Sequence, residues 1–166
     1  DQPLAQRFVK YIAATAVGPG ALPRIYPAIA AALLLRRQAG APPLDIIICE
    51  NLRNASAAFR LGLRVHLPSD FPLEERLGLI ETSIGKMVPI MPEEARRQDP
   101  LLLYAEAYNT LILDAKAFRN AIPQVAGLDP KQNMAAYVER KAFVHNCGHA
   151  ACAYLGSLES PQWIYV

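Results

Sequence analysis

Apolar runs alternate with turn-forming residues along the first half of the chain, and this pattern predicts a β-α-β winding. The run from Val9 to Ala16 is short, apolar and compatible with a strand, and glycine and proline at positions 18–20 end it. An alanine- and leucine-rich stretch of helical length follows, from Leu22 to Arg37. The almost wholly apolar segment Leu44 to Cys49 is typical of a parallel strand covered on both faces. A second helix is expected to begin near Asn54 or Ser56.

The second half predicts further strands and then one long helix. Segment Leu67 to Gly78 is expected to form a loop and a short helix that lead to a strand near Glu81 to Val88. The apolar runs Leu101 to Ala107 and Thr110 to Leu113 are expected to pair as strands outside the parallel winding. Asp129-Pro130 is a suitable helix start, and no proline follows before about Leu155.

These elements together predict an α/β fold with two parts. Residues 1–114 are expected to form the second part of a Rossmann-type parallel sheet with added strands. Residues 115–166 are expected to form the start of a mostly helical substrate domain.

Composition narrows the classes of partner. With 17 basic and 15 acidic residues and a formal charge of +2, the chain has no basic tract, which argues against nucleic acid. The longest apolar stretch, Ile25 to Leu35, contains Pro27 and is far shorter than the roughly 20 residues that span a bilayer, so no membrane partner is expected. The three cysteines cannot all pair within the chain, which favours a reducing, cytoplasmic setting. Nothing in the sequence indicates the oligomeric state.

The predicted long helix carries polar side chains that could act on an alcohol. Lys141, His145, Asn146, His149 and Cys152 fall within a sector of roughly 140° at about 100° per residue. A lysine removed from water can serve as a general base, and an amide NH2 can donate a hydrogen bond to a developing alkoxide. The alternative is that Lys141 extends along the surface and His149 is a half-buried histidine with satisfied hydrogen bonds. Spacing alone does not decide between them.

The run His145 to Cys152 also contains the residue types that bind zinc. Cys147 points away from the face that His145, His149 and Cys152 share, and no second cluster of ligands exists in the chain. We therefore expect no metal.

Two predicted strands end in residues that could bind a ligand. Glu50-Asn51 stands at the carboxyl end of a parallel strand, where open α/β sheets bind their ligands. Asn51 could equally be a helix cap or turn residue. The segment Thr15-Ala16-Val17-Gly18 follows the first strand, and its alternative is an ordinary strand-to-helix turn in which glycine gives backbone freedom.

Four runs of the sequence resemble the polyol-specific long-chain dehydrogenases, and among them the members that act on mannitol 1-phosphate. The runs are Thr15 to Ala30, Ile46 to Ala55, Asp99 to Asp114 and Tyr137 to Gly156. The last is the most specific, because it has a lysine, an asparagine five residues later and a histidine three beyond that, in a helix that ends in Tyr-Leu-Gly.

The resemblance implies a role for each matching residue. Lys141 would be the general base, Asn51 and Asn146 would hydrogen-bond the alkoxide, and His149 would bind and orient the substrate hydroxyl. The implied reaction converts mannitol 1-phosphate to fructose 6-phosphate with NAD as the hydride acceptor and without a metal. The nicotinamide side of the cofactor site would be lined by Thr15, Ala16, Val17, Gly18, Glu50 and Asn51.

Two departures from the family pattern leave alternatives open. Gly85 and Lys86 stand where the family usually has an aspartate and an arginine, and lysine does not replace arginine at a bidentate site. The glycine-rich phosphate turn is absent, so the chain is expected to begin midway through the dinucleotide-binding domain and to be inactive or feeble alone. A dehydrogenase of a hexuronate or a free polyol, or a non-catalytic paralogue, stays possible.

Overall fold

The fold is built on a mixed sheet of five strands. The computed structural model describes residues 12–162. The strand order is β1-β2-β3-β4-β5, with bounds Ile12–Thr15, Leu44–Ile48, Leu77–Ser83, Leu111–Asp114 and Leu128–Lys131. β1, β2 and β3 are parallel neighbours, β4 runs antiparallel to β3, and β5 runs parallel to β4. The sheet and its crossing helices confirm the predicted Rossmann-type α/β fold with added strands.

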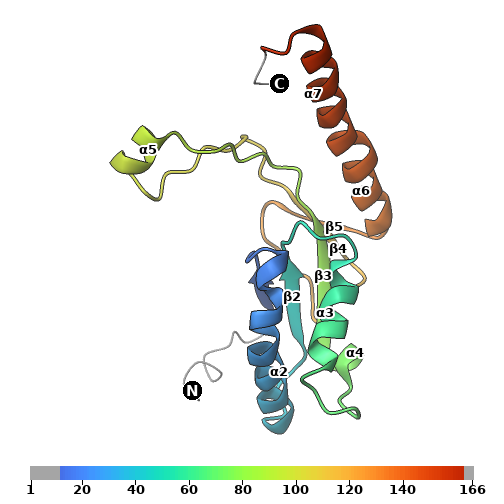
Figure 1. The fold of residues 1–166 in the computed structure, drawn as a ribbon. Coiled ribbons are helices and arrows are strands. Elements are labelled where there is room, and N and C mark those ends of the chain that lie inside the picture. The colour runs from blue at the N-terminus through green and yellow to red at the C-terminus, as the bar shows by residue number, and fades with distance from the viewer. Residues whose placement is uncertain (1–11, 163–166) are drawn as a thin grey trace.

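Two helices cover one face of the parallel strands. α2 (Leu22–Gln38) follows a short 3-10 turn, η1 (Pro19–Ala21), and α3 (Ala55–Arg64) follows β2. Figure 1 shows α2 and α3 side by side in front of the sheet, with the four-residue α4 (Leu73–Arg76) below α3. Leu44, Ile46 and Ile48 of β2 pack against these helices, whereas Ile47 belongs to a smaller cluster that Phe118 joins on the other face. Burial on both faces explains why four of the five residues of β2 are apolar.

The contact between α2 and α3 depends on a small residue. The Tyr26 and Phe59 rings meet edge to face, with their centroids 5.4 Å apart. Gly62 lies directly against the Tyr26 ring, and a Cβ atom at this position would overlap it. The missing side chain lets the two helices pack closely.

β2 also contains a buried carboxylate. Asp45 is 1% exposed, and its side chain accepts hydrogen bonds from the backbone N–H of Arg119 at 2.8 Å and of Asn120 at 3.0 Å. The Asn120 side-chain amide donates a third bond at 2.8 Å. Gly78 of β3 leaves room for this carboxylate, because a Cβ there would collide with it and lie 2.7 Å from the Ala117 carbonyl oxygen. Asp45 thus fastens the loop after β4 to the amino end of β2.

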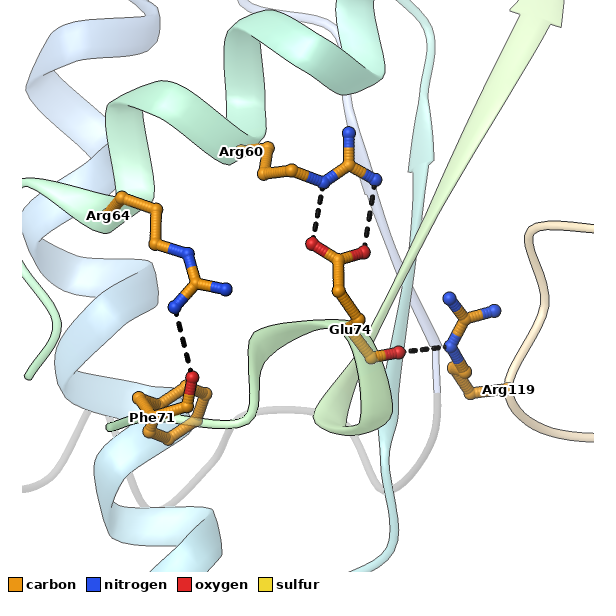
Figure 2. A network of polar contacts seen from close by, with 5 residues as sticks. All are labelled: Arg60, Arg64, Phe71, Glu74 and Arg119. Carbon is orange, nitrogen blue, oxygen red and sulfur yellow. Dashed lines mark hydrogen bonds and ion pairs between the residues drawn. The ribbon is translucent and has the colours of Figure 1, made fainter. Parts of the chain in front are cut away.

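A second polar network joins α3, α4 and the same loop at the surface. Figure 2 shows the Arg60 guanidinium against both oxygens of the Glu74 carboxylate, at 2.7 Å and 3.2 Å. Arg119 donates to the Glu74 backbone carbonyl at 2.5 Å, and Arg64 donates to that of Phe71 at 3.1 Å. Because these side chains are largely exposed, the network sets positions more than it adds stability.

Two segments extend from this compact part. Residues 84–110 form an arm with α5 (Glu93–Gln98) at its tip, and α6 (Met134–Arg140), η2 (Lys141–Asn146) and α7 (Cys147–Glu159) form one continuous rod (Figure 1). The bonds of η2 follow the wider π-helical pattern. None of the described residues of α7 is buried.

Within residues 12–162, no helix combines the length and the apolar composition needed to cross a membrane.

Several sequence predictions are confirmed. The Leu22 to Arg37 helix is found at Leu22–Gln38, and the Leu44 to Cys49 strand at Leu44–Ile48. α3 begins at Ala55 with Asn54 as its N-cap, and Asn54 adopts a left-handed conformation with a φ of 54°. Positions 9–11 of the first predicted strand lie outside the described residues. The division of the chain at residue 114 stays a prediction.

Other predictions are wrong, and burial or strand pairing gives the reason. The strand expected near Glu81 to Val88 is Leu77–Ser83, because the residues that enter the core are Leu77, Leu79 and Ile80. Residues 101–107 form no strand, and β4 pairs with β3 and β5 instead. Asp129-Pro130 lies within β5, an edge strand where proline is tolerated. The rod begins at Met134, after Asn133, whose side chain accepts a hydrogen bond from the Ala136 N–H.

Candidate functional site

A small cavity of about 130 Å³ lies where the carboxyl ends of β2 and β3 meet the rod. Its lining combines polar residues that follow these strands with residues of the rod, among them Glu50, Asn51, Ser83, Lys141, Ala142 and Asn146. The structure therefore brings together three of the four residues predicted to be catalytic. Ligands of open α/β sheets bind at this edge.

One hydrogen bond in this cavity joins residues that are 90 positions apart in sequence. Lys141 Nζ donates a hydrogen bond to Asn51 Oδ1 at 3.5 Å. Because the carbonyl oxygen of Asn51 faces the lysine, its NH2 group is the part that can donate to a ligand oxygen. Lys141 is half-buried, whereas Asn51 and Asn146 are exposed. An amine and two amides thus surround a space that solvent can reach.

The first turns of the rod position Lys141. Met134 is buried against the sheet, and the Asn133 side chain caps α6. Ser83, the last residue of β3, donates from its hydroxyl to the Tyr137 carbonyl oxygen at 3.4 Å. These contacts fix α6 one turn before Lys141.

Glu50 holds the turn that follows β1. Its buried carboxylate accepts the backbone N–H of Val17 at 2.9 Å and that of Gly18 at 2.8 Å. Gly18 has a φ of 83°, a conformation that favours glycine. Ala16, Val17 and Gly18 are exposed beside the strand ends. Glu50 thus joins two segments that were both predicted to bind the cofactor.

Burial raises the pKa of two groups near Glu50, the Cys49 thiol and the Tyr26 hydroxyl. Burial raises the pKa of the Cys49 thiol, and the charge of Glu50 raises it further. Burial also raises the pKa of the Tyr26 hydroxyl, with the same contribution from Glu50. The Thr15 hydroxyl is buried and has no hydrogen-bond partner among the described residues. Because its pKa is raised, the Cys49 thiol is not a reactive thiolate at neutral pH.

A larger cavity of about 540 Å³ lies on the other side of Lys141. Ser83 and Lys141 line both cavities. The remaining lining comes from the base of the arm, from β4 and from the rod, and includes Gly85, Glu106, Tyr108, Arg140 and His145. Sequence reasoning did not select Glu106, Tyr108 or Arg140 as site residues. Their signal was present, however, because they lie in the two runs Asp99 to Asp114 and Tyr137 to Gly156.

The structure places the other sequence candidates further away. His149 is exposed and lines neither of these two cavities, although its ring centroid is 4.5 Å from that of His145. Cys152 is also exposed. Lys86 donates from its ammonium group to the side chain of Asn109. Across residues 12–162, histidine, cysteine, aspartate and glutamate form no group of three or more that could hold a metal ion.

The chain is similar to proteins that act on polyols. A family model described as the mannitol dehydrogenase Rossmann domain matches residues 4–127. The crystal structure of a D-sorbitol dehydrogenase in substrate-free form matches with a TM-score of 0.72 and 18% sequence identity. The match covers 90% of this chain and 40% of the sorbitol dehydrogenase chain. Mannitol 2-dehydrogenase from Pseudomonas fluorescens, solved with NAD and D-mannitol, is 19% identical with a TM-score of 0.65, over 84% and 37%. The chain thus spans about two fifths of the length of these structures.

Proposed function

Because this chain belongs to the mannitol dehydrogenase family, through a Rossmann-domain match at residues 4–127, we propose that it carries much of the active site of an NAD-dependent polyol dehydrogenase. The proposed substrate is mannitol 1-phosphate, which is oxidised to fructose 6-phosphate. The observation that carries the proposal is the contact between Lys141 and Asn51 in a cavity at the carboxyl edge of the sheet. This contact unites a base and a hydrogen-bond donor from distant parts of the chain.

The residues around the first turn fit a nicotinamide cofactor. They lie at the sheet edge where dinucleotides bind, and the turn is held by two hydrogen bonds to Glu50. The unpartnered hydroxyl of Thr15 offers a hydrogen bond nearby, within the described part of the chain. Thr15 to Gly18 with Glu50 and Asn51 would line the nicotinamide side. When bound, NAD supplies the acceptor for the hydride that leaves the carbinol carbon.

The chain's own residues manage the proton and the developing charge. As the carbinol C–H bond breaks and its electron pair leaves as hydride, the O–H bond breaks and Lys141 Nζ takes the proton, so that a carbonyl group forms. When Lys141 acts as the base, the lone pair of its amine takes the proton and its N–H groups can still donate to Asn51. Asn51 and Asn146 would donate to the substrate oxygen as negative charge develops on it. His149 is proposed to orient the substrate from the side of His145.

The larger cavity supports a phosphorylated substrate. Arg140 and His145 line it next to Lys141, and guanidinium groups bind phosphate through paired, charge-assisted hydrogen bonds. The Arg140 guanidinium lies 4.8 Å from the centroid of the Tyr137 ring, a stacking that limits its freedom. The one carboxylate in this lining, Glu106, already accepts the Met87 N–H at 2.9 Å. The cavity therefore favours an anionic group beside the base.

Steady-state oxidation of candidate substrates tests the proposal. The longest natural polypeptide that contains this chain is supplied with NAD and one of three substrates. These are mannitol 1-phosphate, free mannitol and a hexonate, which a hexuronate dehydrogenase would oxidise to the hexuronate. NADH formation is followed by absorbance. We expect kcat/KM for mannitol 1-phosphate to exceed that for uncharged mannitol by about 100-fold, since one charge-assisted anchor is worth about 1.5–3 kcal/mol, and also to exceed that for the hexonate. A preference for free mannitol or the hexonate would identify the alternative dehydrogenases. Absence of turnover with every substrate would indicate a non-catalytic paralogue.

Arg140→Ala tests the phosphate assignment. Loss of one guanidinium–phosphate contact is expected to raise KM for mannitol 1-phosphate about 10- to 100-fold, with little change in kcat, because the contact exists before and during the reaction. Arg96→Ala is the matched control, since Arg96 is an exposed arginine on α5, remote from both cavities. An unchanged KM in Arg140→Ala would remove Arg140 from the phosphate site.

A further inference from the structure

The spacing of Lys141 and Asn146 is unsuited to a regular α-helix. At about 100° per residue, side chains five positions apart point about 140° away from each other. Lys141 and Asn146 would then stand at the two ends of the polar sector of the rod. A cavity of about 130 Å³ nevertheless contains both of them in its lining.

A local change of helix type in the rod allows Lys141 and Asn146 to line one cavity. The six residues Lys141–Asn146 form a π-helical turn between the α-helices α6 and α7. In a π-helix the hydrogen bond closes on the fifth residue, so residues five apart stack along one side, as residues four apart do in an α-helix. Lys141 and Asn146 are the first and last residues of this turn.

Local packing does not explain the turn. α6 is fixed to the sheet before the turn, through Met134 and through the Ser83 hydroxyl. After the turn, α7 has no buried residue among those described. Glycine and proline, common causes of helix irregularities, are absent from positions 141–146. Since π-helical turns are rare and are frequently found at functional sites, a role in the site is the simpler explanation.

We infer that the π-helical turn Lys141–Asn146 is the positioning element that brings the amine of Lys141 and the amide of Asn146 to one cavity. The inference rests on the proposed function for the chemical roles of the two residues. A π-helical turn holds one residue more than an α-helical turn, so the side chains of Lys141 and Asn146 lie on one side of the rod although five positions separate them. The spacing of lysine and asparagine is thereby matched to a single site.

NMR couplings across hydrogen bonds test the geometry in this chain without any substrate. In the 166-residue chain labelled with ²H, ¹³C and ¹⁵N, we expect the Asn146 amide to couple to the Lys141 carbonyl, five residues earlier. Coupling to the Ala142 carbonyl instead would show a regular α-helix and overturn the inference. This readout is independent of activity, so it fails separately from the proposed function.

Two changes of length test the role in the active enzyme. Phe143 is 66% exposed and lines neither cavity, so its deletion removes no group from the site. The deletion leaves lysine and asparagine four residues apart, about 40° in an α-helix, and we expect kcat to stay within about 10-fold. An alanine inserted between Phe143 and Val144 separates them by six residues and is expected to lower kcat about 100-fold or more, as is Asn146→Ala, because each removes an alkoxide donor.

The outcomes separate the positioning role from the reaction itself. Equal activity of the deletion and insertion variants would overturn the inference. A π-helical coupling pattern combined with full activity of Asn146→Ala would also overturn the inference. In that case, loss of activity in Lys141→Ala would still uphold the proposed reaction. Full activity of both substitutions would reject the proposed function.

Discussion

Lys141→Ala is expected to lower kcat for mannitol 1-phosphate oxidation by about 100- to 10,000-fold, the range that a positioned general base contributes. The variant lacks the amine that takes the carbinol proton, and it also loses the hydrogen bond that holds Asn51 at 3.5 Å. The measurement is NADH formation under saturating substrate in the longest natural polypeptide that contains this chain. Binding of NADH, followed by fluorescence, should be retained, because the turn at Val17 and Gly18 is held by Glu50 and not by Lys141.

The matched control is Lys116→Ala. Lys116 is an exposed lysine in the loop after β4 and lines neither cavity, so its removal changes the charge of the protein by the same amount without touching the site. We expect kcat of this variant to stay within about two-fold, since surface substitutions usually have small effects. If Lys141→Ala retains the activity of Lys116→Ala, Lys141 is not the base.

Helix and strand predictions succeeded where a single physical signal dominated. The strand Leu44–Ile48 is buried on both sides of the sheet, and four of its five residues are apolar because of that burial. The helix Leu22–Gln38 has high helix propensity along most of its length and a turn at each end. Pro130 misled, because proline suits the start of a helix and also an edge strand, and only the pairing partner β4 distinguishes them.

The site was only partly accessible from local patterns. No local sequence pattern connects Asn51 with Lys141, which lies 90 residues later. Their expected proximity came from the resemblance to a family rather than from periodicity. The sector drawn for the predicted helix assumed a constant α-helical rotation, so it could not show the π-helical turn. Arg140 and Glu106 escaped notice because each looks like an ordinary surface residue until the fold places both beside one cavity.

Tertiary pairing also decides which polar residues support the fold. Asp45 interrupts an apolar strand, and the sequence alone suggested no partner for it. In the structure its three donors come from Arg119 and Asn120, about 75 residues later, and Gly78 provides the space. A buried carboxylate is stable when such donors surround it. Asp45 lies near the amino end of β2, whereas the candidate site lies at the carboxyl end, so its contribution is to stability rather than chemistry.

Asp45→Ala is expected to lower the free energy of unfolding of the chain by about 2–4 kcal/mol, because it leaves two backbone N–H groups and one amide without their acceptor. Urea denaturation followed by circular dichroism measures the change. Asp70→Ala is the control, since the Asp70 side chain is 75% exposed and its contact with Arg37 is 3.8 Å long. We expect that variant to lose at most about 1 kcal/mol. Equal midpoints for the two variants would show that the Asp45 contacts do not stabilise the sheet. At temperatures where Asp45→Ala is folded, kcat per folded molecule should be unchanged, because the Lys141 and Asn51 contact lies at the opposite edge.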